Sequence, residues 1–218
     1  MQLEPRLEAK HVSFRYQKNS PWILRDVDLS VRAGERVALV GPSGYGKSTL
    51  AKILAGYVEP VEGEVLWDGE PLPKKGFCPV QMIGQHPERA VNPRWKMARI
   101  VNEGGPVDGQ VLRDMGIEQE WMKRWPSELS GGELQRFCIA RALGPGLKFL
   151  ICDEISTMLD VVTQAQIWQK VLEAAEKGHL GMIVVTHNMA LAERVCERII
   201  ELPRLDHRRA ENENGRSG

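Results

Sequence analysis

The sequence predicts an α/β fold in which a parallel β-sheet is flanked by helices, and three observations indicate it. Short apolar runs of strand length alternate with helix-like segments, which is typical of a parallel sheet with helices on both faces. A glycine-rich loop at 41–49 separates a buried strand from a helix. A second buried strand ends in two adjacent carboxylates, Asp153 and Glu154, at the sheet edge where such folds bind ligands.

The bulk composition restricts the class of protein. The chain has 218 residues, 42% of them hydrophobic, which suffices for the core of one large domain over 1–218. The chain has 29 Lys and Arg residues in total and 29 Asp and Glu residues, so its formal net charge is zero. A neutral chain gives no electrostatic reason to expect nucleic acid as a partner. No segment has the ~20 apolar residues that a membrane-spanning helix needs, and the N-terminus has no signal-peptide pattern. A role at a membrane therefore requires a partner that supplies the spanning helices.

The four cysteines form no CxxC pair. Cys138 falls in a predicted helix and Cys152 in an apolar run, so we expect both to be small core residues. The other two are Cys78 and Cys196. No disulfide framework is visible, which favours a reducing compartment.

The first third of the chain predicts strands around one helix. From Val27 to Arg32 apolar and polar residues alternate strictly, as in a strand with one buried face. Residues 37–40 are continuously apolar, as expected of a strand covered on both faces. A helix should follow at about 48–56. Residues 63–71 read as a short strand with an Asp68-Gly69 turn.

The segment at about 86–130 differs in character, because Pro, Gly and Trp punctuate it, and we interpret it as a small, mostly helical insertion. The polar tail at about 203–218 is expected to fray. Between them the predicted elements are a helix at about 132–143, a strand at 148–152, a longer helix that ends at Gly178, a strand at 182–186 and a helix at 189–199.

Residues 41–49 read GPSGYGKST and fit the phosphate-binding pattern GxxxxGK[ST]. Glycines let successive backbone N–H groups face an anion, and the helix that follows adds free donors and a favourable dipole. Lys47 suits the β- and γ-phosphates of a nucleotide, and the Ser48 hydroxyl suits Mg²⁺. The candidate nucleotide-binding residues here are Gly41, Pro42, Ser43, Gly44, Tyr45, Gly46, Lys47, Ser48 and Thr49. Tyr45 fills a free position of the pattern, and its side chain receives no role.

The acidic pair suits the hydrolysis of a bound triphosphate. Asp153 is placed to support Mg²⁺, and Glu154 to position and deprotonate the attacking water. A strand that ends in Asp-Glu is also compatible with helix capping. The phosphate loop about a hundred residues earlier favours the catalytic interpretation.

Phosphate loops occur in kinases, GTPases, helicases and motors, and the segment 129–136, LSGGELQR, narrows the choice. It resembles the signature of ATP-binding cassette (ABC) proteins, although an SGGE turn alone is compatible with ordinary capping. The resemblance spans roughly 7–202 and implies a P-loop NTPase core with N-terminal antiparallel strands. It also implies an ATPase that uses ATP and Mg²⁺ and pairs with a second cassette. The residues that would grip the nucleotide of that second cassette are Ser130, Gly131, Gly132 and Glu133.

The same resemblance assigns the remaining site residues. Tyr16 matches the aromatic residue that stacks on adenine, with a strand-edge tyrosine as the alternative. Gln85, favoured over Gln81 by the His-Pro that follows it, matches the glutamine that joins core and insertion and contacts Mg²⁺ or water. Asp160 matches the aspartate that meets the partner subunit, and His187 the γ-phosphate histidine. The implied catalytic residues are therefore Glu154, His187 and Gln85.

Three positions depart from the family pattern. Ile155 stands in place of the usual proline after the glutamate, Met158 in place of a small residue, and Gly84 in place of an aromatic residue. These departures concern the packing of the loop after Glu154 more than the catalytic groups.

The segments 86–97 and 159–168 resemble those of oligopeptide and nickel importers. The implied protein is the ATPase subunit of a peptide or nickel importer, on the cytoplasmic face of the membrane, with permease subunits, a solute-binding protein and a homo- or heterodimeric cassette partner. The predicted insertion is shorter than is common in that branch, so another metal, a metallophore or a small peptide remains open as cargo. The alternatives are an accessory subunit of a phosphonate-cleaving complex, a soluble cassette ATPase of DNA repair or translation, and a regulator with little turnover.

Overall fold

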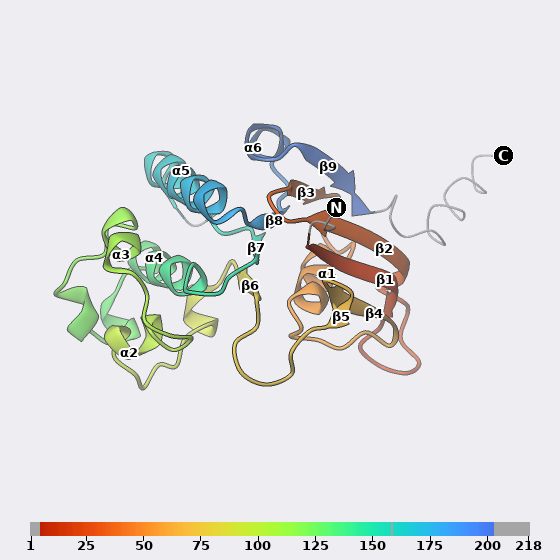
Figure 1. The fold of residues 1–218 in the computed structure, drawn as a ribbon, viewed down its shortest axis with the longest axis horizontal. Coiled ribbons are helices and arrows are strands. Elements are labelled where there is room, and N and C mark those ends of the chain that lie inside the picture. Colours follow the sequence, from red (N-terminus) through yellow and green to blue (C-terminus); the bar gives the residue numbers. More distant parts are fainter. Residues whose placement is uncertain (1–4, 158, 203–218) are drawn as a thin grey trace.

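A parallel sheet forms the centre of the molecule (Figure 1). The computed structural model describes residues 5–157 and 159–202, and all elements below lie in that part. The sheet has the order β6-β7-β8-β3-β9, and every neighbouring pair is parallel. Its strands are β6 (Val80–Ile83), β7 (Phe149–Asp153), β8 (Gly181–Val185), β3 (Arg36–Val40) and β9 (Arg198–Glu201). The predicted parallel sheet is therefore confirmed.

A second, antiparallel sheet has the order β2-β1-β4-β5. Its strands are β2 (Leu24–Arg32), β1 (Arg6–Phe14), β4 (Glu62–Trp67) and β5 (Glu70–Pro71). Asp68 and Gly69 join β4 to β5 with φ of 53° and 82°, the positive values that a tight two-residue hairpin needs. The N-terminal antiparallel strands and the hairpin are both confirmed.

Side-chain alternation along the central strands divides the core into two layers. In β7, Leu150 and Cys152 point into the cluster beneath the helices α4 (Gly131–Ala142) and α5 (Val161–Gly178). Phe149 and Ile151 point to the opposite face, into the cluster with α1 (Lys47–Leu54) and the antiparallel sheet. The central sheet is therefore buried on both faces, as its continuous apolar strands indicate. One face carries helices alone, whereas α1 shares the other with the second sheet.

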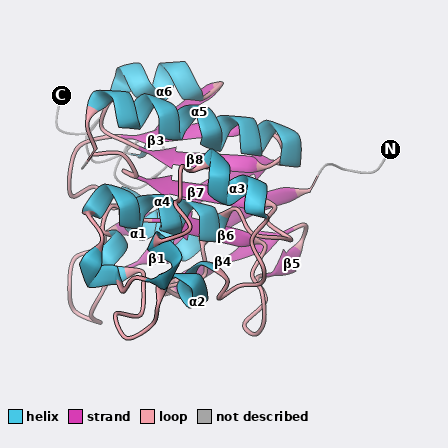
Figure 2. Ribbon diagram, turned by 90° about the vertical axis from the view of Figure 1, so that its left-hand side faces the viewer, coloured by secondary structure: helices cyan, strands magenta, loops and turns pink. Residues whose placement is uncertain are grey.

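Figure 2 views the molecule from the side of the insertion and shows α5 and α6 (Met189–Val195) stacked along one side of the strands β3, β8 and β7. The insertion itself is helical, but its helices are short, because proline and glycine interrupt them. They are α2 (Met97–Val101), α3 (Gly109–Asp114) and the 3₁₀ turns Pro87–Arg89, Trp121–Lys123 and Pro126–Glu128.

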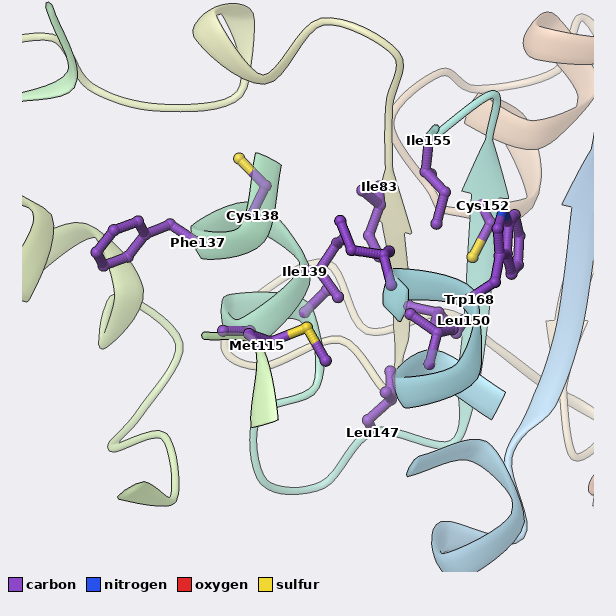
Figure 3. Close-up of a cluster of buried hydrophobic side chains, with 14 of the residues drawn as sticks. Ile83, Met115, Phe137, Cys138, Ile139, Leu147, Leu150, Cys152, Ile155 and Trp168 are labelled. Carbon is purple, nitrogen blue, oxygen red and sulfur yellow. The ribbon is translucent and has the colours of Figure 1, made fainter. Parts of the chain in front are cut away.

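The helix α4 attaches the insertion to the central sheet. Phe137 is fully buried on its insertion side, and Ile139 faces Leu150 of β7 within one continuous cluster (Figure 3). Trp95 and Trp121 of the insertion pack against the same cluster. The signature helix is therefore the mechanical link between the two parts of the chain.

One predicted element at the C-terminal side was wrong. The helix predicted to Ile199 ends at Val195, since Cys196 is extended, with φ −124° and ψ 147°. Residues 198–201 instead form the edge strand β9 beside β3. Every second side chain of this short strand is exposed. Its two apolar residues, Ile199 and Ile200, extended the apolar pattern of the preceding helix, which is why the sequence indicated a longer helix. The prediction that the long helix ends at Gly178 is confirmed, and the residue that follows it, His179, is left-handed with φ 48°.

The cysteine prediction is confirmed for the two core positions. Cys138 and Cys152 are buried and all four thiols are free. Burial raises the pKa of Cys138 to about 11 and that of Cys152 further still, so neither is a reactive thiolate at neutral pH. No helix in the described part of the chain is long and apolar enough to cross a membrane. Met158 and the polar tail at 203–218 lie outside the described residues.

The link through α4 can be tested by truncating its central side chain. Phe137→Ala leaves a cavity in the shared core, so we expect it to lower the free energy of unfolding by about 3–5 kcal/mol. Urea unfolding followed by tryptophan fluorescence measures this change. The matched control is Phe77→Ala, because Phe77 is 37% exposed and should cost on the order of 1 kcal/mol. Equal losses in the two variants would contradict the assignment of Phe137 to the core.

Candidate functional site

The loop between β3 and α1 is shaped to surround an anion. Gly41, Gly44 and Gly46 have φ of 142°, 83° and 92°, in the region that favours glycine. A Cβ at Gly46 would also lie 2.9 Å from side-chain atoms of Ile23 and Leu24. Only glycine therefore lets the chain turn here and enter the helix at Lys47.

The Lys47 ammonium lies inside this loop. Its side chain is almost wholly buried, with the residue 7% exposed, and Nζ donates to the carbonyl oxygens of Gly41 and Pro42 at 2.7 and 2.9 Å. These carbonyls are neutral, so the two hydrogen bonds bring no negative charge to the ammonium, and the nearby Asp153 carboxylate compensates it only in part. A buried charge of this kind favours an anionic ligand, as predicted for the phosphates of a nucleotide.

Ser48 and Asp153 meet beside the loop, from α1 and the end of β7. The Ser48 hydroxyl donates to Asp153 Oδ1 at 3.2 Å. Burial raises the pKa of Asp153 above its ordinary value, and the hydrogen bond from Ser48 opposes part of that rise. The two groups offer hard oxygen donors next to a phosphate-binding loop, and a divalent cation would compensate the buried carboxylate. They fit Mg²⁺ by donor chemistry.

Glu154 and His187 lie at the same edge of the sheet. Asp153 is opposite Val185 of β8 in the register, so the residues that follow the two strands come together. His187 Nδ1 lies 2.8 Å from Glu154 Oε1. Glu154 has φ of 51°, and its N–H donates to the Val185 carbonyl at 3.1 Å. The predicted base and the predicted γ-phosphate histidine are therefore in direct contact.

The signature turn is a capping box at the start of α4. The Ser130 N–H donates to Glu133 Oε2 at 2.6 Å, and the Glu133 N–H donates to Ser130 Oγ at 3.3 Å. The first of these bonds lowers the pKa of Glu133. Within the described chain no hydrogen bond joins this turn to the phosphate loop, so the structure does not bring these two predicted sets together. Ser130 and Gly131 remain exposed.

Gln85 reaches the loop after Glu154 instead of Ser48 or Asp153. Its Nε2 donates to Thr157 Oγ1 at 3.2 Å. Asp160 caps α5, where its carboxylate accepts from the N–H groups of Val162 and Thr163 and from the Thr163 hydroxyl. The Thr163 hydroxyl is the main reason that the pKa of Asp160 is lowered.

The aromatic candidates differ in exposure. Tyr16 is 68% exposed and meets Phe14 edge to face at 5.1 Å, a placement compatible both with a strand-edge residue and with a base-stacking residue. Tyr45 is partly buried and packs against the core around α1, so its side chain supports the loop. Ser43 is exposed and Thr49 is half-buried.

Sequence reasoning missed two polar residues beside the site. Gln135 of α4 is 3% exposed and its Nε2 donates to the Gly84 carbonyl at 3.3 Å. Thr157 contacts Gln85 as described above. Both lie inside segments that had been singled out, LSGGELQR and the stretch after Glu154, but spacing alone does not show which side chains turn inward.

A phosphate loop, an acidic pair and a histidine at the carboxyl edge of a parallel sheet define a P-loop nucleoside triphosphatase. The family model described as "ABC transporter" matches residues 24–157. The chain therefore belongs to the ABC transporter family and is one of its ATP-hydrolysing cassettes.

Relatives and solved structures agree with this assignment. The nickel import ATP-binding protein NikE of Escherichia coli K12 is 35% identical over 211 residues, covering 87% of this chain and 78% of the relative. NikE of Rhodospirillum rubrum is 35% identical over 228 residues, covering 92% and 82%. The dimeric ATP-binding cassette MJ0796, bound to ADP and Pi in a post-hydrolysis state, aligns with a TM-score of 0.75 at 26% identity, covering 89% and 93%.

The buried Asp153 should make the ligand-free protein less stable as the pH rises. Its pKa is raised above 3.8 in the folded state, so the folded chain holds this proton more tightly than the unfolded chain does. The stability that this group contributes is therefore lost as the pH rises from 3.8 through the folded pKa. Asp153→Asn keeps the shape without the charge, and we expect it to raise Tm at neutral pH while hydrolysis is lost.

Thermal unfolding without nucleotide or Mg²⁺ measures this difference. The difference in Tm between Asp153→Asn and the wild type should become smaller as the pH is lowered towards 3.8, because Asp153 is then protonated in the wild type as well. If the Tm of Asp153→Asn at neutral pH is equal to or below that of the wild type, burial of the Asp153 carboxylate costs no stability.

Proposed function

We propose that this chain powers an importer of nickel, in free or chelated form, or of small peptides. Nickel is favoured because the similar NikE proteins are nickel import ATP-binding proteins. The observation that carries the catalytic part is the 2.8 Å contact between His187 and Glu154. It lies at the sheet edge that also receives Lys47 and Asp153. The whole chain, 1–218, would act as one nucleotide-binding domain with a helical insertion at about 86–130.

The residues of one cassette divide the work of hydrolysis. Lys47 and the loop N–H groups would bind the phosphates, and Ser48 and Asp153 would hold Mg²⁺ with a contribution from Gln85. When bound, Mg²⁺ would neutralise phosphate charge. His187 fixes Glu154 Oε1 and leaves Oε2 to accept a proton from water. The oxygen of that water attacks the γ-phosphorus, the bond to the β-phosphate oxygen breaks, and ADP and phosphate result.

A second cassette would complete each site. Ser130 and Gly131 are exposed and have no hydrogen bond to the phosphate loop within the described chain. We infer that they meet a nucleotide held by another copy or a related subunit, in a head-to-tail pair with Asp160 at the contact. Dimeric solved structures of a similar cassette support the pairing of two cassettes.

A groove of about 370 Å³ beside Gln85 suits the membrane partner. It lies between β6, α4 and the start of the insertion, and its lining includes Tyr57, Phe77, Gly84 and Arg141. Tyr57 is 62% exposed and Phe77 37%, so two large side chains of the same groove offer apolar surface to a partner. We infer that a permease segment docks here, so that the cassette works at the cytoplasmic face of the membrane. A solute-binding protein is expected to deliver the cargo.

Two substitutions separate binding of ATP from its hydrolysis. Glu154→Gln removes the base but keeps the size of the side chain, so we expect tight ATP binding and loss of steady-state phosphate release by at least about a hundredfold. Lys47→Ala removes the buried charge, and isothermal titration should detect no nucleotide binding. Turnover of Glu154→Gln at the wild-type rate would show that another group acts as the base.

The docking groove can be tested by recovery of a membrane partner. A tagged chain, purified from detergent-solubilised membranes of its own host, should bring with it a multi-spanning protein. Tyr57→Ala should lower that recovery severalfold and leave ATP hydrolysis unchanged, because Tyr57 lies outside the nucleotide site. The control is Val61→Ala, at a residue that is 50% exposed and outside the groove lining. Recovery of a soluble enzyme complex would instead favour the phosphonate-cleaving alternative.

A further inference from the structure

The chain segment after Glu154 is fixed at its base. Ile155 and Ser156 are 3% and 5% exposed, and the Trp168 indole N–H donates to Ser156 Oγ at 3.1 Å. Trp168 belongs to the buried face of α5. The side chain of Ile155, at the position where the family usually has proline, is therefore held by packing and by this buried hydrogen bond next to it.

Thr157, directly after this anchor, joins two catalytic residues through one hydroxyl. Its Oγ1 donates to the carbonyl oxygen of Glu154 at 3.1 Å and accepts from Gln85 Nε2 at 3.2 Å. A hydroxyl has one proton to donate and lone pairs to accept, so both bonds can exist together. Thr157 is exposed, so these bonds, more than burial of its side chain, determine where its hydroxyl lies.

The Glu154 backbone needs such support because its conformation is strained. A non-glycine residue at φ 51° is held there only by its surroundings. Its N–H is bound by the Val185 carbonyl and its carboxylate by His187. Its carbonyl is bound by Thr157, through both the backbone N–H and the hydroxyl. Loss of the Thr157 hydroxyl would remove one of the contacts that aim the carboxylate.

Gln85, which is joined to Glu154 through the Thr157 hydroxyl, is in turn connected to the helix α4. Gln135 of α4 is nearly inaccessible and donates to the carbonyl of Gly84, next to Gln85. The start of α4 also approaches this segment, since a Cβ on Gly132 would lie 3.1 Å from Leu159 Cδ2. The position of Gln85 is thus tied to α4, and that of Glu154 is tied to Gln85.

We propose that Thr157 is a positioning residue that makes the aim of Glu154 depend on where Gln85 lies. This inference rests on the roles proposed above for Glu154 and Gln85. When Gln85 moves with the insertion, the bond to Thr157 breaks and the base loses its orientation, while the phosphate loop keeps ATP. The link therefore couples the state of the insertion to the chemical step and leaves nucleotide affinity unaffected.

The test is steady-state ATP hydrolysis by the full chain with Mg²⁺, at protein concentrations where the specific activity no longer rises. Thr157→Val keeps the shape and removes both hydrogen bonds of the hydroxyl. We expect kcat to fall about fivefold, which lies within the net effect of ordinary hydrogen bonds. KM for ATP should stay unchanged. Thr157→Ser keeps the hydroxyl and should restore most of kcat.

A double-mutant cycle separates the link from a general structural role. In a Gln85→Met background, Thr157→Val should change kcat by less than twofold, because the link is already broken. Wild-type kcat in Thr157→Val, failure of Thr157→Ser to restore the rate, or a full fivefold loss in both backgrounds would each overturn the proposal.

The failure of this proposal is distinguishable from failure of the proposed function. If the wild type hydrolyses ATP, Glu154→Gln does not, and Thr157→Val matches the wild type, only the positioning role is wrong. If Glu154→Gln hydrolyses ATP like the wild type, the assigned base is wrong, and the role of Thr157 is overturned with it.

Discussion

The parallel register of three central strands is the constraint on which the site depends. Leu39 of β3 and Asp153 of β7 both lie opposite Val185 of β8. The acidic pair begins in that row with Asp153, and the phosphate loop and His187 begin two residues beyond it, so one edge receives all of them. Residues separated by more than a hundred positions thereby come within hydrogen-bonding distance, as Ser48 and Asp153 do. The apolar runs that bury both faces of these strands hold the register, because a slip by one residue would turn every core side chain to the opposite face.

The electrostatics of the site follow from this convergence. Lys47 and Asp153 are both 7% exposed, and the groups that hydrogen-bond their side chains in the described structure are two carbonyls and a hydroxyl. Without nucleotide and cation, each charge is buried with little compensation, which costs folding free energy. ATP and the proposed Mg²⁺ would carry the complementary charges, so these ligands would complete the balance of charge at the site. A site that destabilises the empty protein in this way trades stability for strong ligand binding.

The helix α4 connects the helical insertion with the part of the chain that carries Gln85 and Glu154. Its first turn presents the exposed Ser130 and Gly131, its middle carries the buried Phe137 that holds the insertion, and Gln135 reaches the backbone next to Gln85. A displacement of the insertion therefore acts on a rigid helix rather than on a loop. The same helix borders the groove with Tyr57 and Phe77. Packed side chains and hydrogen bonds within one chain thus connect the groove, the signature turn and Glu154.

The sequence by itself determined the parallel sheet, the phosphate loop and the acidic pair, because these depend on short-range pattern, and its resemblance to ABC proteins supplied the other candidate site residues. Period-two and continuous apolar runs located β2, β3, β7 and β8, and glycine spacing located the turn before Lys47. The edge strand β9 and the strand β6 depended on pairing with β3 and β7, which local pattern does not reveal. The tertiary structure alone decided that Glu154 contacts His187, that Gln85 reaches Thr157, and that the Ser130 turn stays apart from the phosphate loop of its own chain. Contacts of this kind depend on which loops emerge at the same sheet edge and on backbone strain at single residues, and neither is encoded in the spacing of residue types.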